Sequence, residues 1–476
     1  MKDYGDNDNS GGPFDLLVIG AGSAGFSAAI TAADGGANVA LIGHGTIGGT
    51  CVNVGCVPSK AMIRAVEIMH SAAAVGRFDG IDASAKVTDW AAVVRQKQAL
   101  VDDLRAAKYI DVLPNYDAVT YIEGAARFQA DGSVAVDGQV IKAGKVIIAT
   151  GSRPHVPNLS GLDNVDWLDS TTALELEALP ASMTIMGGGY IGVELAQIFA
   201  RAGSKVTIVT RRGLLPEAEP EIGEALTQYF ADEGITVLGG LHYDRLEQSD
   251  GQVTLHASQA GKPLEIASER LLLSTGRVPN TDSLALDIAG IDTDKRGGIV
   301  TNDQMRTSLA HVYAAGDVTG RDQFVYMAAY GAKLAAKNAM TNAGMVYDNS
   351  TMPAVVFSDP QVASVGLTEA AANAQGIETV TSVLPLEHVP RALAARDTRG
   401  LIKLVAEKGS KRLLGGHILA PEGSDSIQTV AMALKIGMTY DDLGAMIFPY
   451  LTTVEGLKLA AQTFEKDVAK LSCCAG

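Results

Sequence analysis

A glycine motif that occurs twice constrains the fold of this chain more than any other feature. In "FDLLVIGAGSAGFSAAITAADGGANVALIG" an apolar strand run, 14–19, meets Gly20, Gly22 and Gly25 and then an alanine-rich helix. The first glycine permits a tight turn, the second lets the backbone approach a pyrophosphate, and the third lets helix and strand pack closely. Because "ANVALIG" then returns as a second strand, the context predicts a dinucleotide site at the helix N-terminus.

The second strand of this unit ends without the acid that its position calls for. At such a strand end an aspartate or glutamate binds a ribose hydroxyl of the dinucleotide. Here the position is taken by Gly43, followed by His44. The sequence therefore leaves open which group contacts the ribose at the first site.

A second copy of the motif lies at "ASMTIMGGGYIGVELAQIFARAGSKVTIVTRR", with Gly187, Gly189 and Gly192 in the same spacing. Two copies imply two dinucleotides. The second strand is followed by Arg211 and Arg212 instead of an acid, and a guanidinium pair suits a 2′-phosphate, where a carboxylate would repel it. The sequence thus favours NADPH over NADH, and the alternative for the two arginines is a solvated loop.

Length, composition and charge limit the class of protein. A chain of 476 residues with 47% hydrophobic content can bury a large core and divide into about two to four domains. No apolar run reaches the roughly 18 residues of a membrane span, and the polar, acidic start predicts a flexible leader over 1–13 rather than a signal peptide. The net charge of -16 repels phosphate backbones and anionic lipid, so we expect a cytoplasmic protein without nucleic-acid or membrane partners.

The four cysteines form two close pairs, Cys51 with Cys56 and Cys473 with Cys474. Secreted disulfide scaffolds are much denser in cysteine, so reactive thiols are the better interpretation. In the terminal "LSCCAG" the adjacent α-carbons are about 3.8 Å apart, below the usual disulfide separation of about 4.4–6.8 Å. Such a pair prefers the dithiol form, and two neighbouring thiolates chelate soft metal ions.

Three further apolar strands end in small residues, "VIIATG" (146–151), "LLLSTGR" (271–277) and "VYAAGD" (312–317). In this order, and together with "GGTCVNVGCVPSK" at 48–60, they resemble the pyridine nucleotide-disulfide oxidoreductases, a family of FAD-containing homodimers. The resemblance implies an α/β fold with two Rossmann-like domains, binding FAD and NAD(P), and a C-terminal α+β dimerisation domain. The implied parts are 14–151 (FAD, first part), 152–280 (NADPH), 281–351 (FAD, central part) and 352–476 (dimerisation, with the Cys-Cys tail).

The resemblance also implies cofactor contacts. Asp317 would hold the ribityl chain of FAD, Val325 would lie near the flavin, and 124–126 would lie near the adenine. The remaining implied contacts around the two cofactors are Thr50, Lys60, Ala126, Gly151 and Gly276.

The same resemblance assigns the chemistry of the first cysteine pair. A short span at a helix start can close a disulfide and can lower a thiol pKa through the helix N-terminus. By the resemblance, Cys56 lies against the flavin as a charge-transfer thiolate and Cys51 faces the substrate. Lys60 would pair with Glu194, with a surface salt bridge as the alternative. Tyr190 would cover the nicotinamide pocket, with ordinary packing as the alternative.

The sequence departs from the family where an organic disulfide would be reduced. Relatives of that kind carry a His-Pro dipeptide near the C-terminus, whose histidine, backed by a glutamate, protonates the departing thiolate. In "IFPYLTTVEG" Phe448 stands in place of the histidine and Thr453 in place of the glutamate. An organic disulfide is therefore a poor substrate unless another acid, with His388 and His417 as the open candidates, takes over.

The combination of "GGTCVNVGCVPSK", "FPYLTTVEGLKLAAQTF" and "LSCCAG" resembles the branch of this family that reduces Hg(II). The resemblance implies that Cys473 and Cys474 of one subunit take Hg(II) from thiols and pass it to the first cysteine pair of the partner. Tyr450 and Tyr190 would lie near the transfer point. NADPH would reduce FAD, and two electrons would then convert the thiol-bound ion to Hg(0), which gives mercury detoxification.

Two other interpretations stay open. One is a disulfide reductase of the dihydrolipoamide dehydrogenase or glutathione reductase type, which Phe448 and Thr453 oppose. The other is a metal-sequestering thiol protein with a vestigial flavin fold, which the missing acid at Gly43 favours and the intact glycine motifs oppose. Many Hg(II)-reducing relatives carry a further N-terminal metal-binding domain with a Cys-x-x-Cys motif, which this sequence lacks.

Overall fold

The computed structural model describes residues 14–470. The expected leader, 1–13, and the pair Cys473 and Cys474 lie outside the described residues. The chain forms two compact units. Unit 1 combines 14–58, 98–154 and 277–348 of the described chain, and unit 2 combines 59–97, 155–276 and 349–470.

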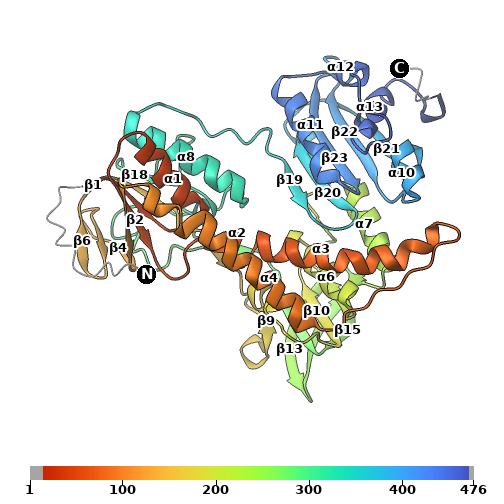
Figure 1. The fold of residues 1–476 in the computed structure, drawn as a ribbon, viewed down its shortest axis with the longest axis horizontal. Helices are drawn as coiled ribbons and strands as arrows, with labels where there is room; N and C mark the ends of the chain where they lie inside the picture. Colours follow the sequence, from red (N-terminus) through yellow and green to blue (C-terminus); the bar gives the residue numbers. More distant parts are fainter. Residues whose placement is uncertain (1–13, 471–476) are drawn as a thin grey trace. The chain divides into compact units, whose positions relative to one another are not determined.

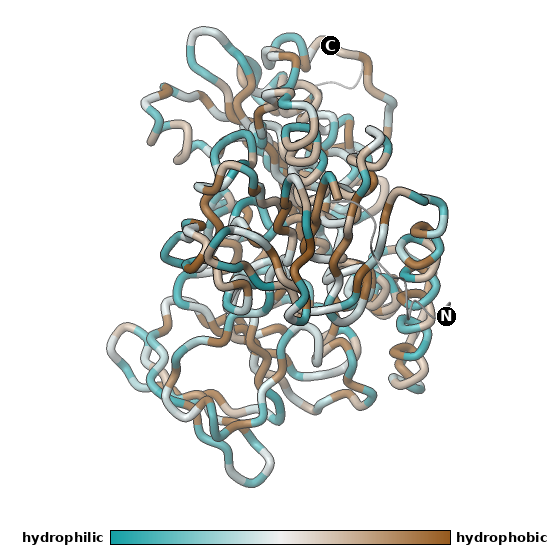
Figure 2. Tube along the Cα trace, turned by 90° about the vertical axis from the view of Figure 1, so that its left-hand side faces the viewer, coloured by the Kyte–Doolittle hydropathy of each residue, from teal (hydrophilic) through white to brown (hydrophobic). Residues whose placement is uncertain are grey.

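Unit 1 is built on a five-stranded parallel sheet in the order β18-β7-β1-β2-β3. Its strands are β1 (Phe14–Ile19), β2 (Val39–Gly43), β3 (Val119–Glu123), β7 (Ala143–Ile148) and β18 (Val312–Ala314). Helices α1 (Ser23–Asp34) and α8 (Val325–Thr341) lie side by side against this sheet (Figure 1). Strands β2 and β18 are completely buried, β1 and β7 are buried toward their carboxyl ends, and β3 at the edge is half-buried. Figure 2 shows apolar runs as brown segments.

Smaller strand groups complete unit 1. An antiparallel sheet contains β4 (Ala126–Phe128), β5 (Val134–Val136) and β6 (Gln139–Ile141). A two-stranded ribbon pairs β8 (Ser152–Pro154) with β17 (Arg277–Pro279), at the two points where the chain leaves unit 1 and returns to it. The ribbon therefore marks the insertion of 155–276.

The first part of unit 2 repeats the parallel design. Its sheet has the order β12-β11-β10-β16-β9. The strands are β9 (Trp167–Leu168), β10 (Ser182–Met186), β11 (Lys205–Val209), β12 (Thr236–Leu238) and β16 (Arg270–Leu273). Helices α6 (Tyr190–Ala202) and α7 (Pro220–Asp232) accompany it, as does an antiparallel sheet of β13 (Leu241–Ser249), β14 (Gln252–Gln259) and β15 (Lys262–Ser268).

Residues 59–97, which the sequence places with the first FAD part, belong to unit 2 in the structure. The segment contains most of α3 (Cys56–Ala73) and the start of α4 (Trp90–Arg105). The reason is packing, because Met62, Val66 and Trp90 are buried in one core cluster with residues of α6 and β10. The helix that starts at Cys56 thus begins in unit 1 and continues in unit 2.

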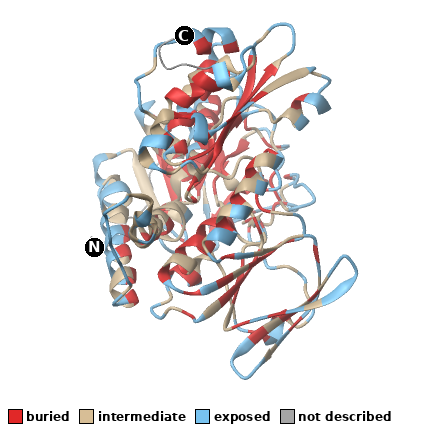
Figure 3. Cartoon of the chain, turned by 90° about the vertical axis from the view of Figure 1, so that its right-hand side faces the viewer, coloured by how far each residue is buried: buried red, intermediate tan, exposed pale blue. Residues whose placement is uncertain are grey.

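The C-terminal part of unit 2 is an antiparallel sheet, β19-β20-β23-β22-β21. Its strands are β19 (Ala354–Val356), β20 (Gln361–Gly366), β21 (Thr379–Pro385), β22 (Leu401–Glu407) and β23 (Leu413–Ala420). The accompanying helices are α9 (Glu369–Ala374), α10 (Pro390–Ala395), α11 (Gly423–Lys435), α12 (Tyr440–Ala445) and α13 (Glu455–Gln462). Strands β22 and β23 are almost completely buried. In Figure 3 buried residues are red and exposed residues pale blue, and the helices show both colours.

These sheets confirm the predicted fold class. Each parallel sheet contains a strand, β1 or β10, that leads through a glycine turn into a helix, and the last part is α+β. Among the described helices, none is both long enough and apolar enough to cross a membrane.

Candidate functional site

The first glycine turn leaves no room for side chains. Gly20 has φ +118°, and a Cβ atom added to Gly25 would overlap the carbonyl oxygen of Gly20. Gly22 caps α1 without any side-chain hydrogen bond, so the first turn presents its backbone N–H groups at the carboxyl edge of the sheet. This cradle fits a pyrophosphate.

The cysteine loop packs directly against this turn. A Cβ atom added to Gly49 would lie 2.7 Å from the Cα of Gly22, so the two backbones touch. Gly49 begins the short helix α2 (Gly49–Asn53), which carries Thr50 and Cys51. The loop therefore places Cys51 two residues from the backbone contact with the phosphate cradle.

Both cysteines of this pair are half-buried, and Cys56 is the first residue of α3. A helix start stabilises a thiolate. The loop between them is braced by Asn53, whose amide nitrogen donates to the carbonyl oxygens of Ile47 and Gly49, both at 2.9 Å. Arg105 in turn donates to the Asn53 side-chain oxygen at 3.1 Å. The pair thus sits on a fixed loop.

Sequence reasoning missed Tyr109, which the structure places beside this loop. Its hydroxyl lies 3.0 Å from the Ser23 hydroxyl in the first turn of α1, and its ring packs edge-on against Phe26 at 4.8 Å. Burial raises the pKa of Tyr109, and negative charge on Cys51 and Cys56 raises it further, against a hydrogen bond with Ser23 that lowers it. The phenol therefore stays protonated next to two thiol groups.

No sequence motif predicts that Tyr109 lies at this site. It lies in a π-helical turn, Ala106–Ile110, that follows α4. Such wide turns often occur at functional sites, because they redirect a side chain that a regular helix would point elsewhere. The signal exists only in the backbone geometry.

Asp317 lies at the same edge of unit 1. It begins a short 3-10 turn after β18, and the Ser152 hydroxyl donates to its Oδ2 at 2.7 Å. Arg277 donates to the Ser152 hydroxyl at 2.8 Å and approaches Asp317 Oδ2 at 3.9 Å. The preceding Gly316 is close to α1, since a Cβ atom added there would lie 3.1 Å from that of Ala24. The structure thus brings Asp317 to the first turn of α1, and Val325 begins α8 eight residues later.

The second glycine turn repeats the first in unit 2. Gly187 has φ +124°, and a Cβ atom added to Gly192 would overlap the Gly187 carbonyl oxygen and lie 2.7 Å from the Ser274 hydroxyl. Gly189 caps α6 without a side-chain hydrogen bond. Gly276, with φ +108°, follows β16. This turn also fits a pyrophosphate.

The arginine pair follows β11 and is accessible. The Arg211 guanidinium lies 5.4 Å from the centre of the Tyr243 ring, and Arg212 contacts Glu217 at 2.6 Å in an exposed ion pair. Exposed pairs contribute little free energy, so Arg212 is available to an anion. Burial raises the pKa of Tyr243, and the charge of Arg211 opposes this effect, so that the pKa is about 12.

The predicted pair of Lys60 and Glu194 is confirmed. The Lys60 ammonium donates to both carboxylate oxygens of Glu194, at 2.9 and 2.7 Å. Glu194 is only 6% exposed and also accepts from the backbone N–H of Phe357 at 3.0 Å. The Lys60 nitrogen lies 4.7 Å from the centre of the Phe357 ring. This is a packed, oriented pair rather than a loose surface salt bridge.

Tyr190 and Tyr450 differ in setting. Tyr190 is the first residue of α6 and is 39% exposed, and its pKa is raised by burial and by the charge of Glu217. Tyr450 is 57% exposed in the loop before α13. Both hydroxyl-bearing rings are thus accessible in the described chain.

The C-terminal loop has no acid-base pair in the positions that the family uses. Phe448 packs against the core of the antiparallel sheet. Glu455, two residues after Thr453, is buried and accepts a hydrogen bond from the backbone N–H of Leu451 at 3.1 Å. Its carboxylate therefore fixes the loop and does not replace the missing glutamate.

The two histidines that the sequence left open are now placed. His417 is 1% exposed on β23, its Nε2 is 3.1 Å from the Leu367 carbonyl oxygen, and burial lowers its pKa. A residue enclosed in this way cannot hand a proton to a substrate at the surface. His388 is exposed and lies 3.5 Å from Glu387.

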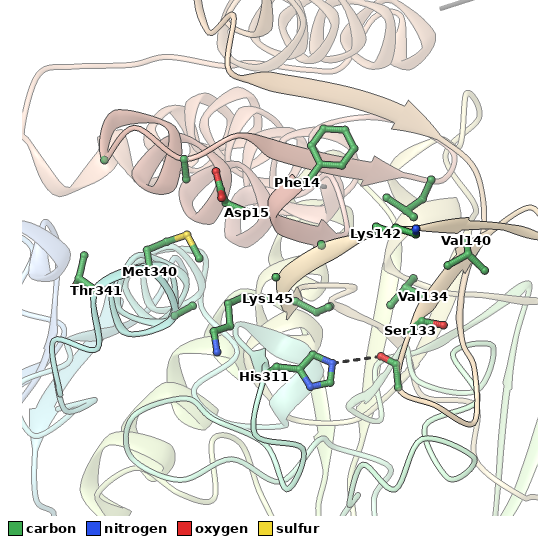
Figure 4. Close-up of a pocket in the computed structure, with 18 of the residues that line it drawn as sticks. Phe14, Asp15, Ser133, Val134, Val140, Lys142, Lys145, His311, Met340 and Thr341 are labelled. Carbon is green, nitrogen blue, oxygen red and sulfur yellow. Dashed lines mark hydrogen bonds between the residues drawn. The ribbon is translucent and has the colours of Figure 1, made fainter. Parts of the chain in front are cut away.

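A cavity of about 880 Å³ in unit 1 lies at the opposite end of the parallel sheet (Figure 4). Phe14 and Lys145, near the amino ends of their strands, line it together with His311, whose Nε2 lies 3.3 Å from the Gly132 carbonyl oxygen. Nucleotides bind at the carboxyl ends of parallel strands. We therefore do not assign a cofactor to this cavity.

Between residues 14 and 470 no group of three or more histidine, cysteine or acidic side chains is arranged to hold a metal ion. The terminal pair, Cys473 and Cys474, lies beyond this range. Cys51 and Cys56 are the cysteines of the described chain.

Comparison with known families gives two matches. The profile of the pyridine nucleotide-disulphide oxidoreductases matches residues 14–336, and that of the dimerisation domain of the same family matches residues 352–461.

Curated relatives match over nearly the whole chain. A mercuric reductase of Lysinibacillus sphaericus is 46% identical over 97% of this chain and 85% of its own. A mercuric reductase of Streptomyces lividans is 46% identical over 97% of this chain and 98% of its own length. A mercuric reductase of Shigella flexneri is 47% identical over 100% of this chain and 86% of its own length. Among solved structures, the Cu(II) complex of the HOCl-induced flavoprotein disulfide reductase RclA from Escherichia coli is similar, with 30% identity, a TM-score of 0.84 and coverage of 95% of this chain and 100% of that one.

Proposed function

The chain belongs to the pyridine nucleotide-disulphide oxidoreductases, and we propose that within this family it is an NADPH- and FAD-dependent enzyme that reduces thiol-bound Hg(II) to Hg(0). The observation that carries the proposal is the similarity to mercuric reductases along the full length of the chain, at 46% identity over 97% of it. The reaction detoxifies mercury.

The residues of the two glycine turns fit the two cofactors. When bound, FAD and NADPH supply the hydride and electron transfer of the reaction. The chain contributes the two phosphate cradles, and the contact between Gly22 and Gly49 holds the cysteine loop beside the first of them. Arg211 and Arg212 offer two guanidinium groups to a 2′-phosphate, which favours NADPH.

Cys51 and Cys56 are the proposed ligands of Hg(II) during its reduction. Thiolates are soft ligands and select soft ions. The start of α3 stabilises a thiolate at Cys56. The fixed loop connects this helix to α2, which carries Cys51. We further propose that Tyr109, whose phenol is protonated and feels the charge of the pair, donates a hydrogen bond to a ligand that leaves the ion.

A homodimer is expected from the dimerisation domain at residues 352–461. We infer that Cys473 and Cys474 of one subunit collect Hg(II) and pass it to Cys51 and Cys56 of the partner subunit. The exposed rings of Tyr450 and Tyr190 support a role at the point of transfer. The cytoplasm is the proposed location, since thiols that must stay reduced suit a reducing compartment.

Reduction of an organic disulfide is the weaker alternative. It requires an acid to protonate the departing thiolate. Phe448 packs against the core, Glu455 is bound to the loop, and His417 is enclosed. Reduction of a bound metal ion releases no thiol that must be protonated in the same step, so the loop as found is compatible with it.

The test compares substrates. Purified full-length protein is supplied with NADPH and either Hg(II) in excess small thiol, lipoamide or oxidised glutathione. We expect NADPH oxidation with Hg(II) and a rate at least about 100-fold lower with either disulfide, because general acid catalysis contributes about 10²–10⁴-fold. A faster reaction with a disulfide would overturn the proposal. A protein that purifies without a flavin spectrum would instead favour metal sequestration.

The tail is tested separately. Cys473→Ala with Cys474→Ala should abolish turnover of thiol-bound Hg(II) and leave flavin content and reduction by NADPH unchanged. Ser472→Ala, next to the pair, is the matched control. Full turnover in the double variant would refute the shuttle.

A further inference from the structure

The end of β2 lacks an acidic side chain, and a side chain from the neighbouring strand occupies the space. A Cβ atom added to Gly43 would overlap the hydroxyl oxygen of Tyr121 and would lie 2.7 Å from Cε2 and Cζ of the same ring. Contacts this short do not occur between real atoms. No residue other than glycine is therefore compatible with Tyr121 in its present position.

The strand register places a carboxylate on the same face. β2 and β3 are parallel, with Leu41 opposite Tyr121 and Gly43 opposite Glu123. Side chains two residues apart on a strand point to the same face of the sheet, as do those of paired residues. Tyr121, Glu123 and the missing side chain of Gly43 thus share one face at the carboxyl edge.

The electrostatics of Tyr121 are consistent with this placement of Glu123. Burial raises the pKa of Tyr121, and the negative charge of Glu123 raises it further. The phenol is therefore neutral near pH 7 and keeps its proton for a hydrogen bond. Glu123 itself is exposed at the strand end, where a ligand can reach it.

This strand end adjoins the first phosphate cradle. The backbone N–H of Gly20, the first glycine of the turn, donates to the Ile42 carbonyl oxygen at 2.8 Å. The N–H of Gly124, just after β3, donates to the Gly43 carbonyl oxygen at 2.8 Å. The turn, the end of β2 and the end of β3 are thus joined in one row. In a dinucleotide site the ribose beside the pyrophosphate lies along this row.

We propose that Tyr121 and Glu123 replace the missing acid of β2 and bind the adenosine ribose of the dinucleotide at the first glycine turn. Neighbouring strands are about 4.8 Å apart, which a glutamate side chain spans, so an acid one strand further on reaches the same ribose. The Glu123 carboxylate accepts a hydrogen bond from a ribose hydroxyl. The Tyr121 hydroxyl occupies the volume of the absent side chain and offers a second hydrogen bond.

The inference rests on the proposed function, in which FAD occupies this site. Its test uses the full-length chain, deflavinated and then titrated with FAD, with quenching of flavin fluorescence as the readout. Two further ligands are FAD analogues whose adenosine ribose lacks the 2′- or the 3′-hydroxyl. The variants are Glu123→Gln and Tyr121→Phe, which preserve size and shape.

We expect Glu123→Gln to raise the dissociation constant of FAD about 10- to 100-fold, since a hydrogen bond to a charged group is lost. Tyr121→Phe should raise it about 2- to 10-fold, the effect of a neutral hydrogen bond. With one of the two deoxy analogues, wild type should lose the same affinity and Glu123→Gln should lose nothing further. A residue that only supports the fold would weaken FAD and both analogues equally.

Asp117→Asn and Tyr116→Phe are matched controls, because they make the same changes before the other end of β3 and should leave all three affinities unchanged. The proposal is overturned if Glu123→Gln binds FAD like wild type, or if the variant loses as much affinity as wild type does with the deoxy analogue that wild type binds more weakly. Failure of the proposed function has a different signature. Wild type would then purify without flavin and would bind none of the three ligands.

Discussion

The two glycine turns of this chain are built alike, and the residues around them differ. In each turn the first glycine has a φ near +120°, +118° at Gly20 and +124° at Gly187, and the third glycine has no space for a Cβ atom. Each helix begins at a glycine without a side-chain cap. The backbone of the phosphate cradle is therefore the common part.

The differences lie at two equivalent positions outside the cradle. In unit 1 the second strand, β2, ends at Gly43, whose missing side chain is replaced by the Tyr121 ring. In unit 2 the second strand, β11, ends just before Arg211 and Arg212. Seven residues after the first glycine, Ser27 in α1 donates to the Ala329 carbonyl oxygen of α8, whereas Glu194 in α6 accepts from Lys60 of α3. In the proposed function, the motif binds the phosphates, and the flanking residues select the nucleotide and connect the site to a neighbouring helix.

The largest expected effect comes from closing one cradle at a time. Gly192→Ala places a Cβ atom on the Gly187 carbonyl oxygen, and we expect flavin content to be kept while the rate of reduction by NADPH falls about 100-fold. Gly25→Ala should instead yield protein without flavin. Gly213→Ala, where a Cβ atom would meet nothing within 4 Å, is the control. Absorbance spectra measure the flavin content, and stopped-flow experiments measure the rate of reduction by NADPH. Loss of flavin in Gly192→Ala would show that the two cradles are not independent.

A second variant gives unit 1 the acid that its strand end lacks. Gly43→Glu should lower the affinity for FAD about tenfold or more, because the new side chain collides with the Tyr121 ring and overpacking costs about 1–3 kcal/mol. Adding Tyr121→Ala should restore binding by opening the space. The flavin content of the purified proteins reports the result, and tighter binding in Gly43→Glu alone would contradict the packing described for Tyr121.

The arginine pair, Arg211 and Arg212, tests the difference between the two glycine turns in unit 2. Arg211→Gln with Arg212→Gln should raise KM for NADPH about tenfold or more through the loss of charge-assisted hydrogen bonds, with KM for NADH unchanged. Lys205→Gln, which removes a charge at the opposite end of β11, is the control. An equal effect on both nucleotides would mean that the arginines hold the loop and do not read the 2′-phosphate.

The smallest effects concern the connections to α3 and α8. Glu194→Gln should slow flavin reduction about two- to fivefold, because Lys60 is a third exposed and its lost ion pair is partly screened by water. Ser27→Ala should change this rate less than twofold, since its hydrogen bond leads to α8. Stopped-flow reduction by NADPH compares them, with Glu194→Asp as a partial rescue. A larger loss in Ser27→Ala would reverse the assignment of the two connections.

The sequence predicts what is local and misses what the fold brings together. Both glycine turns are visible because strand, turn and helix are contiguous, and the pair of Lys60 and Glu194 could be predicted from family positions. Tyr109 could not, because it meets Ser23 from 86 residues away through a π-helical turn. Tyr121 and Glu123 could not either, since only the register of β2 and β3 brings them to Gly43.

Core packing explains why residues 59–97 group with unit 2. Residues 59–97 group with unit 2 because the apolar residues of α3 and α4 join the core around Ile185 and Phe199. The sequence shows these helices as amphipathic, but their apolar faces do not indicate which core they enter.

The central claim, that electrons from NADPH reach Hg(II), is tested most directly by the ratio of mercury vapour released to NADPH oxidised. The measurement uses the purified wild-type protein under anaerobic conditions with Hg(II) in excess thiol. Since both reactions transfer two electrons, the account predicts one Hg(0) for each NADPH. NADPH oxidation without vapour would contradict the claim, because the electrons would then have reached another acceptor.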